Sequence, residues 1–497
     1  MNRLRIFFPR GAALGLVLTW LAGCAVGPDF VRPPAPDTDR YVPEPPPRAT
    51  ITADGQAQLF VTGAAIAADW WRLFGSTQLN AVVWTAITNN PTLQASEASL
   101  RASQDNLRAG YGLFFPHLEG NLAAVRQRTA VAQQGMASGG RIFSLVTVGG
   151  SVNYALDVFG GNRRTVEGLR AQADSQRYES QAVCLTLTAN VVNTCVARAA
   201  YAAQVAATEQ LLVLEREQLR LTEAQVRAGV TPYSAVLSLR GLLAANKAAL
   251  APLKQALNRT EHLLSTLQGR LPAQATLSPL DLGGFLLPTN LPVSVPSELV
   301  RQRPDILSAE ALLHVASAKI GVATAAMYPS ISVSGEYGGA SAGLSHLSAL
   351  TAASGQFWSL GPSATVPLFQ GTSLWYGRRA AQDAYRQAAA NYRATVLAAF
   401  AQVADVLNGL THDAEALQAQ VEARAAAREN LALLQVNYRI GLVTYLDVLS
   451  ADIQFQNASL GYLQAVAQRH QDTVALFTAL GGGWWNAPPP APQGARP

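Results

Sequence analysis

Histidines and methionines are the residues of this sequence that could bind a metal, and a glycine-rich phosphate loop is the motif that would indicate an ATPase. The sequence contains six scattered histidines: His117, His262, His314, His346, His412 and His470. They form no His-Glu-x-x-His motif and no close pair, so we expect no metal site. Only three methionines occur, which disfavours a site for soft metals. The Gly-x-x-x-x-Gly-Lys phosphate loop of an ATPase is missing, and no nucleophile and base stand in a credible arrangement, so we expect no enzyme.

One cysteine does lie in a setting that indicates covalent chemistry. Residues 1–23 begin with basic residues and continue with an apolar run that is too short to span a bilayer, which is typical of a secretory signal. The run Leu21-Ala22-Gly23-Cys24 resembles a bacterial lipobox. We therefore expect Cys24 to be the lipidated N-terminus, with no cofactor other than this covalent lipid. An ordinary signal peptide beside a chance cysteine is the alternative.

The largest element expected is one helix over residues 161–229. This stretch has no proline and, inside its ends, one glycine, and it is rich in Ala, Leu, Gln, Glu and Arg, which lose little on entering a helix. At a rise of about 1.5 Å per residue it would extend about 100 Å, more than twice the thickness of a bilayer. Such a helix needs partners along its length.

The second half of the chain repeats the design of the first. Residues 227–238 reappear as residues 439–450, with Arg, Gly, Tyr, Val, Leu and Ser in register. We therefore expect two repeats, 69–285 and 286–483, each with a long helical hairpin, at about 161–268 and 372–480. Pro252 has no counterpart in the second hairpin, so a kink is expected there and the two hairpins should differ.

Each repeat also contains two stretches with a period of two. Apolar residues alternate with polar or small ones over about 117–126, 143–157, 330–340 and 356–369. Leu118 and Leu122, for example, alternate with Glu119 and Asn121. Strands with one apolar and one polar face are typical of a membrane β-barrel. A soluble sandwich with one buried face is the alternative.

Four strands cannot close a barrel, because bacterial barrels have at least about eight. Threefold symmetry is the simplest way for several chains to share one barrel, and it would give twelve strands. The expected fold is therefore an α+β membrane protein with a shared 12-stranded β-barrel, four strands per chain. The resemblance described below implies that this barrel belongs to a homotrimer and is continued by a long α-helical barrel.

The remaining segments are connections and ends. Residues 24–68, rich in proline between positions 28 and 47, are expected to form an extended tether after the lipidated N-terminus. Residues 484–497 are a second proline-rich segment, expected to be a tail. The formal charge of +5 falls to +2 once the three leader arginines are removed, so the mature chain lacks the basic surface of a nucleic-acid-binding protein.

Several motifs stand beside the two glycine turns in a characteristic order: Ala25-Val26-Gly27-Pro28-Asp29-Phe30 after the lipobox, Asp69-Trp70-Trp71-Arg72-Leu73-Phe74, Arg303-Pro304-Asp305-Ile306 and Val366-Pro367-Leu368-Phe369. Taken together, they resemble the TolC-type outer-membrane efflux channels, in particular the NodT-like lipoprotein branch that serves resistance-nodulation-division (RND) pumps. Together they cover nearly the whole mature chain. One departure is Pro91-Thr92-Leu93, where the second half has Pro-Asp-Ile.

This resemblance implies a passive exit channel for small molecules such as drugs and toxic organics. It implies a homotrimer in the outer membrane, lipid-anchored and barrel-inserted, with a helical barrel that extends into the periplasm. The implied partners are a periplasmic adaptor, an inner-membrane RND-type transporter and outer-membrane lipid. Three alternatives remain: a structural periplasm-spanning lipoprotein, a periplasmic lipoprotein enzyme, and an outer-membrane channel for protein or metal export.

The resemblance also assigns site residues around the two turns. In the family these turns face the adaptor, so the contacting residues are expected to be Arg227, Gly229, Thr231, Arg439, Gly441 and Thr444. An acidic residue matching Asp447 helps to form the periplasmic gate, whereas the first half has Ala235 at this position. Three copies of Asp447 near a threefold axis would raise one another's pKa. The family's second acidic position is Ser450 here. A solvated helix-start aspartate is the alternative role for Asp447.

Overall fold

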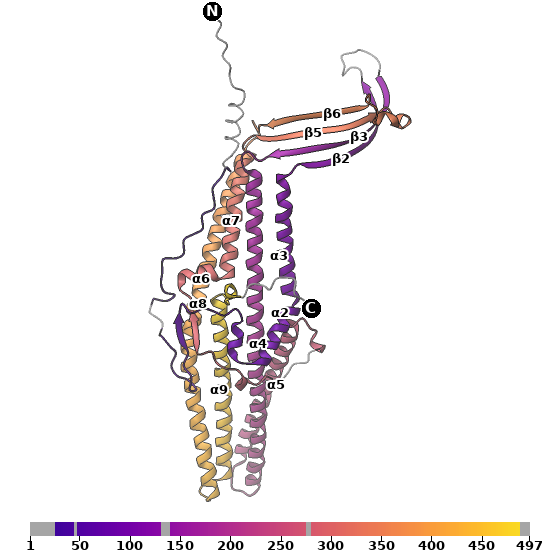
Figure 1. The fold of residues 1–497 in the computed structure, drawn as a ribbon. Coiled ribbons are helices and arrows are strands. Elements are labelled where there is room, and N and C mark those ends of the chain that lie inside the picture. The colour runs from indigo at the N-terminus through magenta and orange to yellow at the C-terminus, as the bar shows by residue number, and fades with distance from the viewer. Residues whose placement is uncertain (1–24, 44–46, 131–139, 275–279, 488–497) are drawn as a thin grey trace, which may run out of the picture. The chain divides into compact units, whose positions relative to one another are not determined.

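The computed structural model describes residues 25–43, 47–130, 140–274 and 280–487. The predicted leader 1–23, Cys24 and most of the predicted tail lie outside the described residues. The chain divides into two compact units. Unit 1 comprises residues 1–32, 100–175 and 309–392, and unit 2 comprises residues 33–99, 176–308 and 393–497. Helices α3 (Pro91–Gly110), α4 (Gly161–Arg227), α7 (Pro304–Ala325) and α8 (Ser373–Arg439) contribute to both units (Figure 1).

Unit 1 contains one four-stranded antiparallel sheet in the order β2-β3-β5-β6. The strands are β2 (His117–Ala130), β3 (Gly140–Leu156), β5 (Ser330–Ser341) and β6 (Gln356–Thr365). The last expected strand, 356–369, is too long by the segment after Thr365. Pro367 has no N–H to donate to a ladder and restricts the residue before it, so the strand ends earlier. Pro362 is tolerated inside β6 because β6 lies at an edge of the sheet.

The register of the sheet separates apolar from polar residues. Leu118 pairs with Val152, which pairs with Gly335, which in turn pairs with Leu360, so these residues share one face. The next row contains Glu119, Ser151, Glu336 and Ser359 and lies on the opposite face. Leu118 and Leu360 are both exposed. The alternation in the sequence therefore produces an apolar face that the chain itself does not cover.

The long helical hairpins have matching lengths. Helices α4 and α8 each contain 67 residues, and the returning helices α5 (Tyr233–Leu267) and α9 (Tyr445–Ala479) each contain 35 residues. Pro252 lies inside α5 without ending it, so the two hairpins are alike in extent. Judged by length and composition alone, α4, α7 and α8 are long and apolar enough to cross a membrane.

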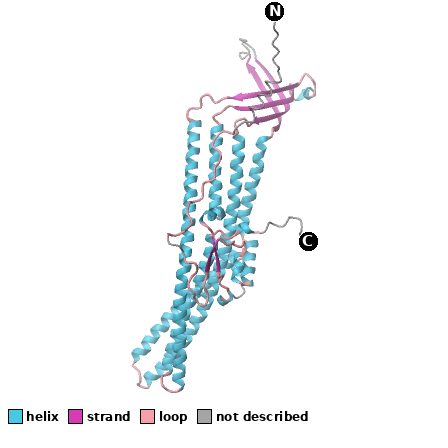
Figure 2. Ribbon diagram, turned by 60° about the vertical axis from the view of Figure 1, so that its left-hand side comes forward, coloured by secondary structure: helices cyan, strands magenta, loops and turns pink. Residues whose placement is uncertain are grey.

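The apolar core of unit 2 joins residues of the long helices to residues of several short elements. Figure 2 shows short strands and short helices beside the long helices. These elements are α2 (Thr77–Asn89), α6 (Pro296–Gln302), a 3₁₀ helix (Trp70–Phe74), and the parallel pair β1 (Leu59–Thr62) and β4 (Asn290–Val293). Trp70 stacks on Phe477 of α9 with ring centroids 5.2 Å apart. The Trp-Trp motif at positions 70 and 71 is therefore a packing motif, since both side chains are buried.

Part of the N-terminal segment is fixed to unit 2 by Arg469 of α9, whose side chain is 2% exposed. Its Nε donates to Gln58 Oε1 (3.1 Å), and its Nη1 donates to the Ala53 carbonyl (3.2 Å). Its Nη2 donates to the Gln56 carbonyl (3.2 Å) and to Thr50 Oγ1 (3.3 Å). Residues 50–58 therefore differ from the extended tether that we expected, because a buried guanidinium needs acceptors and this segment supplies them.

His470, beside Arg469, is a buried imidazole in the core of unit 2. Its ring packs near Phe74 (5.9 Å between centroids) and Phe285 (6.2 Å), and its Nδ1 has no hydrogen-bond partner. Burial in this apolar setting, with a smaller contribution from the Arg469 charge, lowers the pKa of His470 to about 4. The histidine is therefore neutral in the folded chain at neutral pH.

This lowered pKa predicts acid sensitivity. The unfolded chain protonates His470 below about pH 6.5, whereas the folded chain resists protonation until about pH 4, so stability falls as the pH drops between these values. The loss is on the order of 3 kcal/mol by pH 4. We expect His470→Gln to flatten the dependence of the thermal midpoint on pH in this range. An unchanged acid slope in the variant would contradict the assignment.

Candidate functional site

Two glycine turns close the long hairpins at the same end of unit 2 (Figure 1). The first turn, residues 228–232, joins α4 to α5, and the second turn, residues 440–444, joins α8 to α9. Gly229 and Gly441 have φ values of 74° and 79°. A Cβ on either glycine would meet nothing within 4 Å. The left-handed backbone, and not lack of space, is therefore what requires glycine at these positions.

Both turns use the same helix-ending hydrogen bonds. In the first turn, Gly229 N donates to the Val226 carbonyl (3.0 Å) and Val230 N donates to the Gln225 carbonyl (3.0 Å). In the second turn, the donors are Gly441 N, to the Tyr438 carbonyl (3.0 Å), and Leu442 N, to the Asn437 carbonyl (2.9 Å). This Schellman arrangement satisfies carbonyls that the helix end leaves free. The two repeats thus reverse direction by the same physical device.

The helices that follow the turns begin differently. Helix α9 starts with a capping box, in which Asp447 N donates to Thr444 Oγ1 (3.3 Å) and Thr444 N donates to Asp447 Oδ2 (2.8 Å). Helix α5 has Pro232 as its N-cap, with no side-chain capping hydrogen bond, and Ala235 stands where α9 has Asp447. The start of α9 is therefore held more firmly than the start of α5.

The carboxylate of Asp447 is exposed and accepts a second hydrogen bond, from Thr444 Oγ1 (2.7 Å). Hydrogen bonds from the Thr444 hydroxyl and backbone N–H lower the pKa of Asp447 below its ordinary value. Within one chain this direction is opposite to the one expected for a ring of carboxylates. Within one chain, Asp447 therefore caps the start of α9, and its place in a ring of three carboxylates stays a prediction.

The other predicted site residues surround the turns without forming one cluster. Arg227 and Arg439 are the exposed last residues of α4 and α8. Thr231 Oγ1 donates to Gln225 Oε1 (3.2 Å), which stabilises the first turn. In the part of the chain that the structure describes, no group of three His, Cys, Asp or Glu side chains is placed to hold a metal ion.

Sequence reasoning missed two features of this region. The first is an apolar surface on the turns, because Val230, Ile440 and Leu442 are 74%, 65% and 72% exposed. Aliphatic residues beside a turn glycine were a usable signal, since exposed turns are normally polar. The second is a hydrogen bond between the hairpins, in which Gln218 Nε2 of α4 donates to Ser450 Oγ of α9 (3.0 Å).

The sequence model of the family described as "Outer membrane efflux protein" matches residues 82–270 and 295–482, which is more than half of the chain. The chain belongs to this family. It is an outer-membrane efflux channel of the TolC type, so the resemblance identified above is confirmed. This is a family of channels and not of enzymes.

The relatives and solved structures to which this efflux channel is similar match it over most of its length. The pyoverdine export outer membrane protein OpmQ of Pseudomonas putida is 29% identical, over 84% of this chain and 88% of the relative. The cation efflux system protein CusC of Escherichia coli K12 is 28% identical, over 93% and 97%. The solved structure of the outer-membrane channel OprN superposes with a TM-score of 0.80 at 28% identity, covering 93% of this chain and all of that one.

The geometry of the second turn predicts different effects for two substitutions of Gly441. Alanine has room for its Cβ but is strained at this φ by about 1 kcal/mol, whereas asparagine tolerates the left-handed region better. Gly441→Ala should therefore speed amide hydrogen exchange at the end of α8, and Gly441→Asn should change it less. Equal effects of the two substitutions would contradict the assignment of the glycine requirement to φ.

Proposed function

We propose that three copies of this chain form a passive exit duct, a homotrimer with a shared 12-stranded barrel continued by a helical barrel through the periplasm. The observation that carries the proposal is the open, two-faced sheet. The outer edges of β2 and β6 have no strand partner among the described residues, and one face is apolar and exposed. Four strands cannot close on themselves, whereas twelve can.

The matched hairpins support the helical part of the duct. The two helical hairpins have helices of the same lengths and the same glycine turn. They are therefore suited to pack side by side as equivalent parts of the wall of a helical barrel. The family sequence model matches the chain twice, once in each half, which supports an internal repeat. A duct of this kind does not need an energy source of its own. The driving force would come from an inner-membrane RND-type transporter, linked to the duct by a periplasmic adaptor.

We propose small molecules, such as drugs and toxic organics, as the transported class. The names of the relatives include both a pyoverdine export protein and a cation efflux protein, so a channel for metal export remains the second candidate. A structural periplasm-spanning lipoprotein would have no use for an alternating sheet. We propose acyl chains on Cys24 as the only covalent cofactor.

The experiment that tests the duct combines mass and conductance. In lipid, each unpaired backbone group on the edges of β2 and β6 would cost several kcal/mol, so a stable monomer should not exist. We expect native mass measurement of the detergent-extracted protein to give three chains, and planar bilayers to show large stepwise currents. A discrete monomer or dimer would refute the shared barrel, and a trimer without current would indicate a structural lipoprotein.

We propose Asp447 as part of the periplasmic gate. Threefold symmetry would bring three carboxylates near the axis, and such a ring attracts cations. The capping box supports this role, because it orients each carboxylate at the start of α9. Ser450 in place of a second acidic residue weakens the ring, and its hydrogen bond to Gln218 supports a role in joining the two hairpins.

Two substitutions separate the gate role of Asp447 from its capping role. Asp447→Asn removes the charge and leaves a side chain that can hydrogen bond, whereas Thr444→Val removes the capping hydroxyl and leaves the charge. If the charge forms the gate, Asp447→Asn should lower cation selectivity or raise conductance in planar bilayers, and Thr444→Val should not. Equal changes in the two variants, with the trimer intact, would mean that Asp447 acts only as a cap.

We propose that the adaptor contacts both turns. The contacting set would be the predicted residues Arg227, Gly229, Thr231, Arg439, Gly441 and Thr444, extended by the apolar residues Val230, Ile440 and Leu442. Exposed aliphatic side chains flanked by arginines suit a partner that supplies apolar contacts and acceptors for the guanidinium groups.

Charge placed on the turns tests this surface. Ile440→Asp and Leu442→Asp should reduce efflux, measured as lower resistance of cells to exported compounds, because an aspartate cannot be buried against an apolar partner. Leu271→Asp is a matched control, since Leu271 is 65% exposed in the segment that follows α5, away from both turns in the sequence. Trimer content should be equal in all variants. Full efflux by the turn variants would place the adaptor elsewhere.

A further inference from the structure

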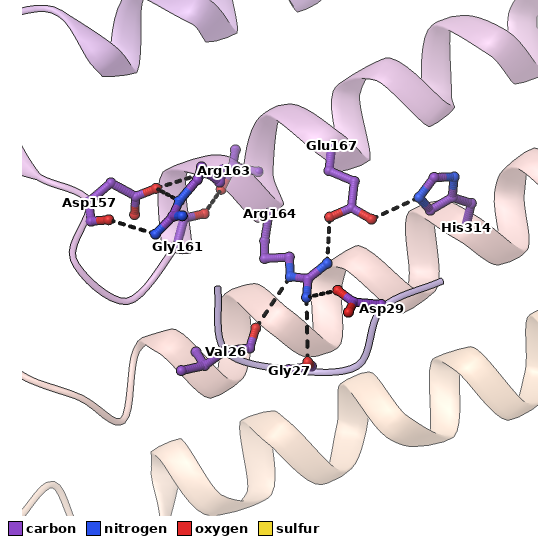
Figure 3. Close-up of polar contacts among 10 residues, drawn as sticks. Val26, Gly27, Asp29, Asp157, Gly161, Arg163, Arg164, Glu167 and His314 are labelled. Carbon is purple, nitrogen blue, oxygen red and sulfur yellow. Dashed lines mark hydrogen bonds and ion pairs between the residues drawn. The ribbon is translucent and has the colours of Figure 1, made fainter. Parts of the chain in front are cut away.

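Arg164, near the start of α4 in unit 1, is a buried arginine that the duct does not explain. Its side chain is 5% exposed. Its Nη2 donates to Asp29 Oδ1 (2.7 Å), and its Nη1 donates to Glu167 Oε2 (2.8 Å). Its Nε lies 3.3 Å from the Val26 carbonyl oxygen, and its Nη2 lies 3.4 Å from that of Gly27 (Figure 3). Most acceptors of this guanidinium thus come from the segment directly after the predicted lipidation site.

Neighbouring side chains extend the attachment. Glu167 also bonds His314 Nε2 of α7 (2.8 Å), as Figure 3 shows. The ring of Phe30 stacks on His314 with centroids 4.2 Å apart and an angle of 11° between the planes. Arg32 Nε forms an ion pair with Glu310 Oε2 of α7 (2.8 Å). Residues 26–32 are therefore held by charged and aromatic side chains of two helices.

Glycines allow the segment to approach the helices this closely. Gly27 has φ of +95°, and a Cβ there would lie 2.5 Å from Gly321 Cα. A Cβ on Gly321 would lie 2.7 Å from Arg164 Cγ, and a Cβ on Gly160, whose φ is +79°, would lie 2.6 Å from Ala25 Cα. Val26 N also donates to the Phe159 carbonyl (3.1 Å). This site is shaped for the backbone of residues 25–29.

We propose that the Arg164 site is a docking site for the processed N-terminal segment, which makes the lipid anchor a fixed part of unit 1. The consequence for the anchor rests on the proposed lipidation of Cys24. One residue, Ala25, separates Cys24 from the Val26 amide, which is bonded to the corner between β3 and α4. If Cys24 is lipidated, this bond would keep the acyl chains within two residues of that corner and not at the end of a free tether.

The strength of the site follows from the burial of Arg164. An arginine stays charged at any physiological pH, so its guanidinium needs acceptors where it is buried under the docked segment. Without residues 26–29 it would keep Glu167 and lose Asp29 and two carbonyl oxygens. Hydrogen bonds to a charged group contribute more than neutral ones, so the contacts of Arg164, together with those of Phe30 and Arg32, favour the docked arrangement.

A spin label at position 31 tests the docking. Val31 is 79% exposed, and in a Val31→Cys protein with Cys184→Ala and Cys195→Ala the label would report only on this segment. The protein is the full-length, processed trimer in lipid vesicles. We expect an immobilised label, and Arg164→Met should raise the mobile fraction about tenfold or more. Arg170→Met, an exposed arginine of the same helix, is the matched control and should change nothing.

Two glycine variants in the N-terminal part of the chain keep the test decisive if Arg164→Met fails to assemble. Gly27→Ala should free the segment without altering a helix, whereas Gly63→Ala, which has similar backbone strain but open space, should not. A label that is already mobile in the parent, or that ignores both Arg164→Met and Gly27→Ala, would overturn the proposal.

Cys24→Ser separates docking from lipidation. If the Arg164 site holds the segment, the label stays immobilised in the unlipidated protein, and a label freed by loss of the lipid would overturn the proposal. The mass of the N-terminal peptide shows independently whether Cys24 carries acyl chains. Conductance of the same trimers reports on the duct, so a failure of the proposed function and a failure of the docking site give different results.

Discussion

The constraint on which this structure depends is the sheet of unit 1, which has too few strands to close. Backbone N–H and C=O groups at a sheet edge need partners, and the bilayer offers none. The register places Leu118, Val152 and Leu360 on one face and Glu119, Ser151 and Ser359 on the other. A sheet with one apolar and one polar face, and with edges at β2 and β6 that lack a strand partner among the described residues, needs further strands, which the proposed sharing of one barrel by several copies of the chain would supply.

The hairpins of unit 2 show how one design is used twice with a local difference. Both turns end a 67-residue helix through a glycine in the left-handed region, so the reversal itself is the same. The helices that return differ at their first turn, because Thr444 and Asp447 cap each other whereas Pro232 has no capping side chain. The difference concentrates charge and rigidity at the start of α9, where the proposed gate lies.

Buried arginines give the N-terminal segment a structural role in both units. Arg164 holds residues 26–29 in unit 1, and Arg469 holds residues 50–58 in unit 2. In each case the guanidinium takes most of its acceptors from the segment and lies among helices that offer few of their own. A proline-rich segment without regular secondary structure can thus be an ordered part of a helical protein, because its free carbonyls are what a buried arginine requires.

The sequence by itself determined the features that repeat at short range. The period of two located the strands, the lack of proline and scarcity of glycine located the long helices, and Gly229 and Gly441 located the turns, because each of these signals acts through neighbouring residues. The end of β6 was missed, because the effect of a proline depends on whether the surrounding ladder can spare one hydrogen bond.

Only the tertiary structure decided which distant groups meet. Nothing in the pattern around Arg164 or Arg469 indicates that these arginines are buried against residues more than a hundred positions away. The exposure of Ile440 and the hydrogen bond of Ser450 to Gln218 likewise depend on how separate helices pack. Periodicity reports which face of an element is apolar. The partner that covers this face, and the acceptors that reach a buried charge, are set by the packing of the whole chain.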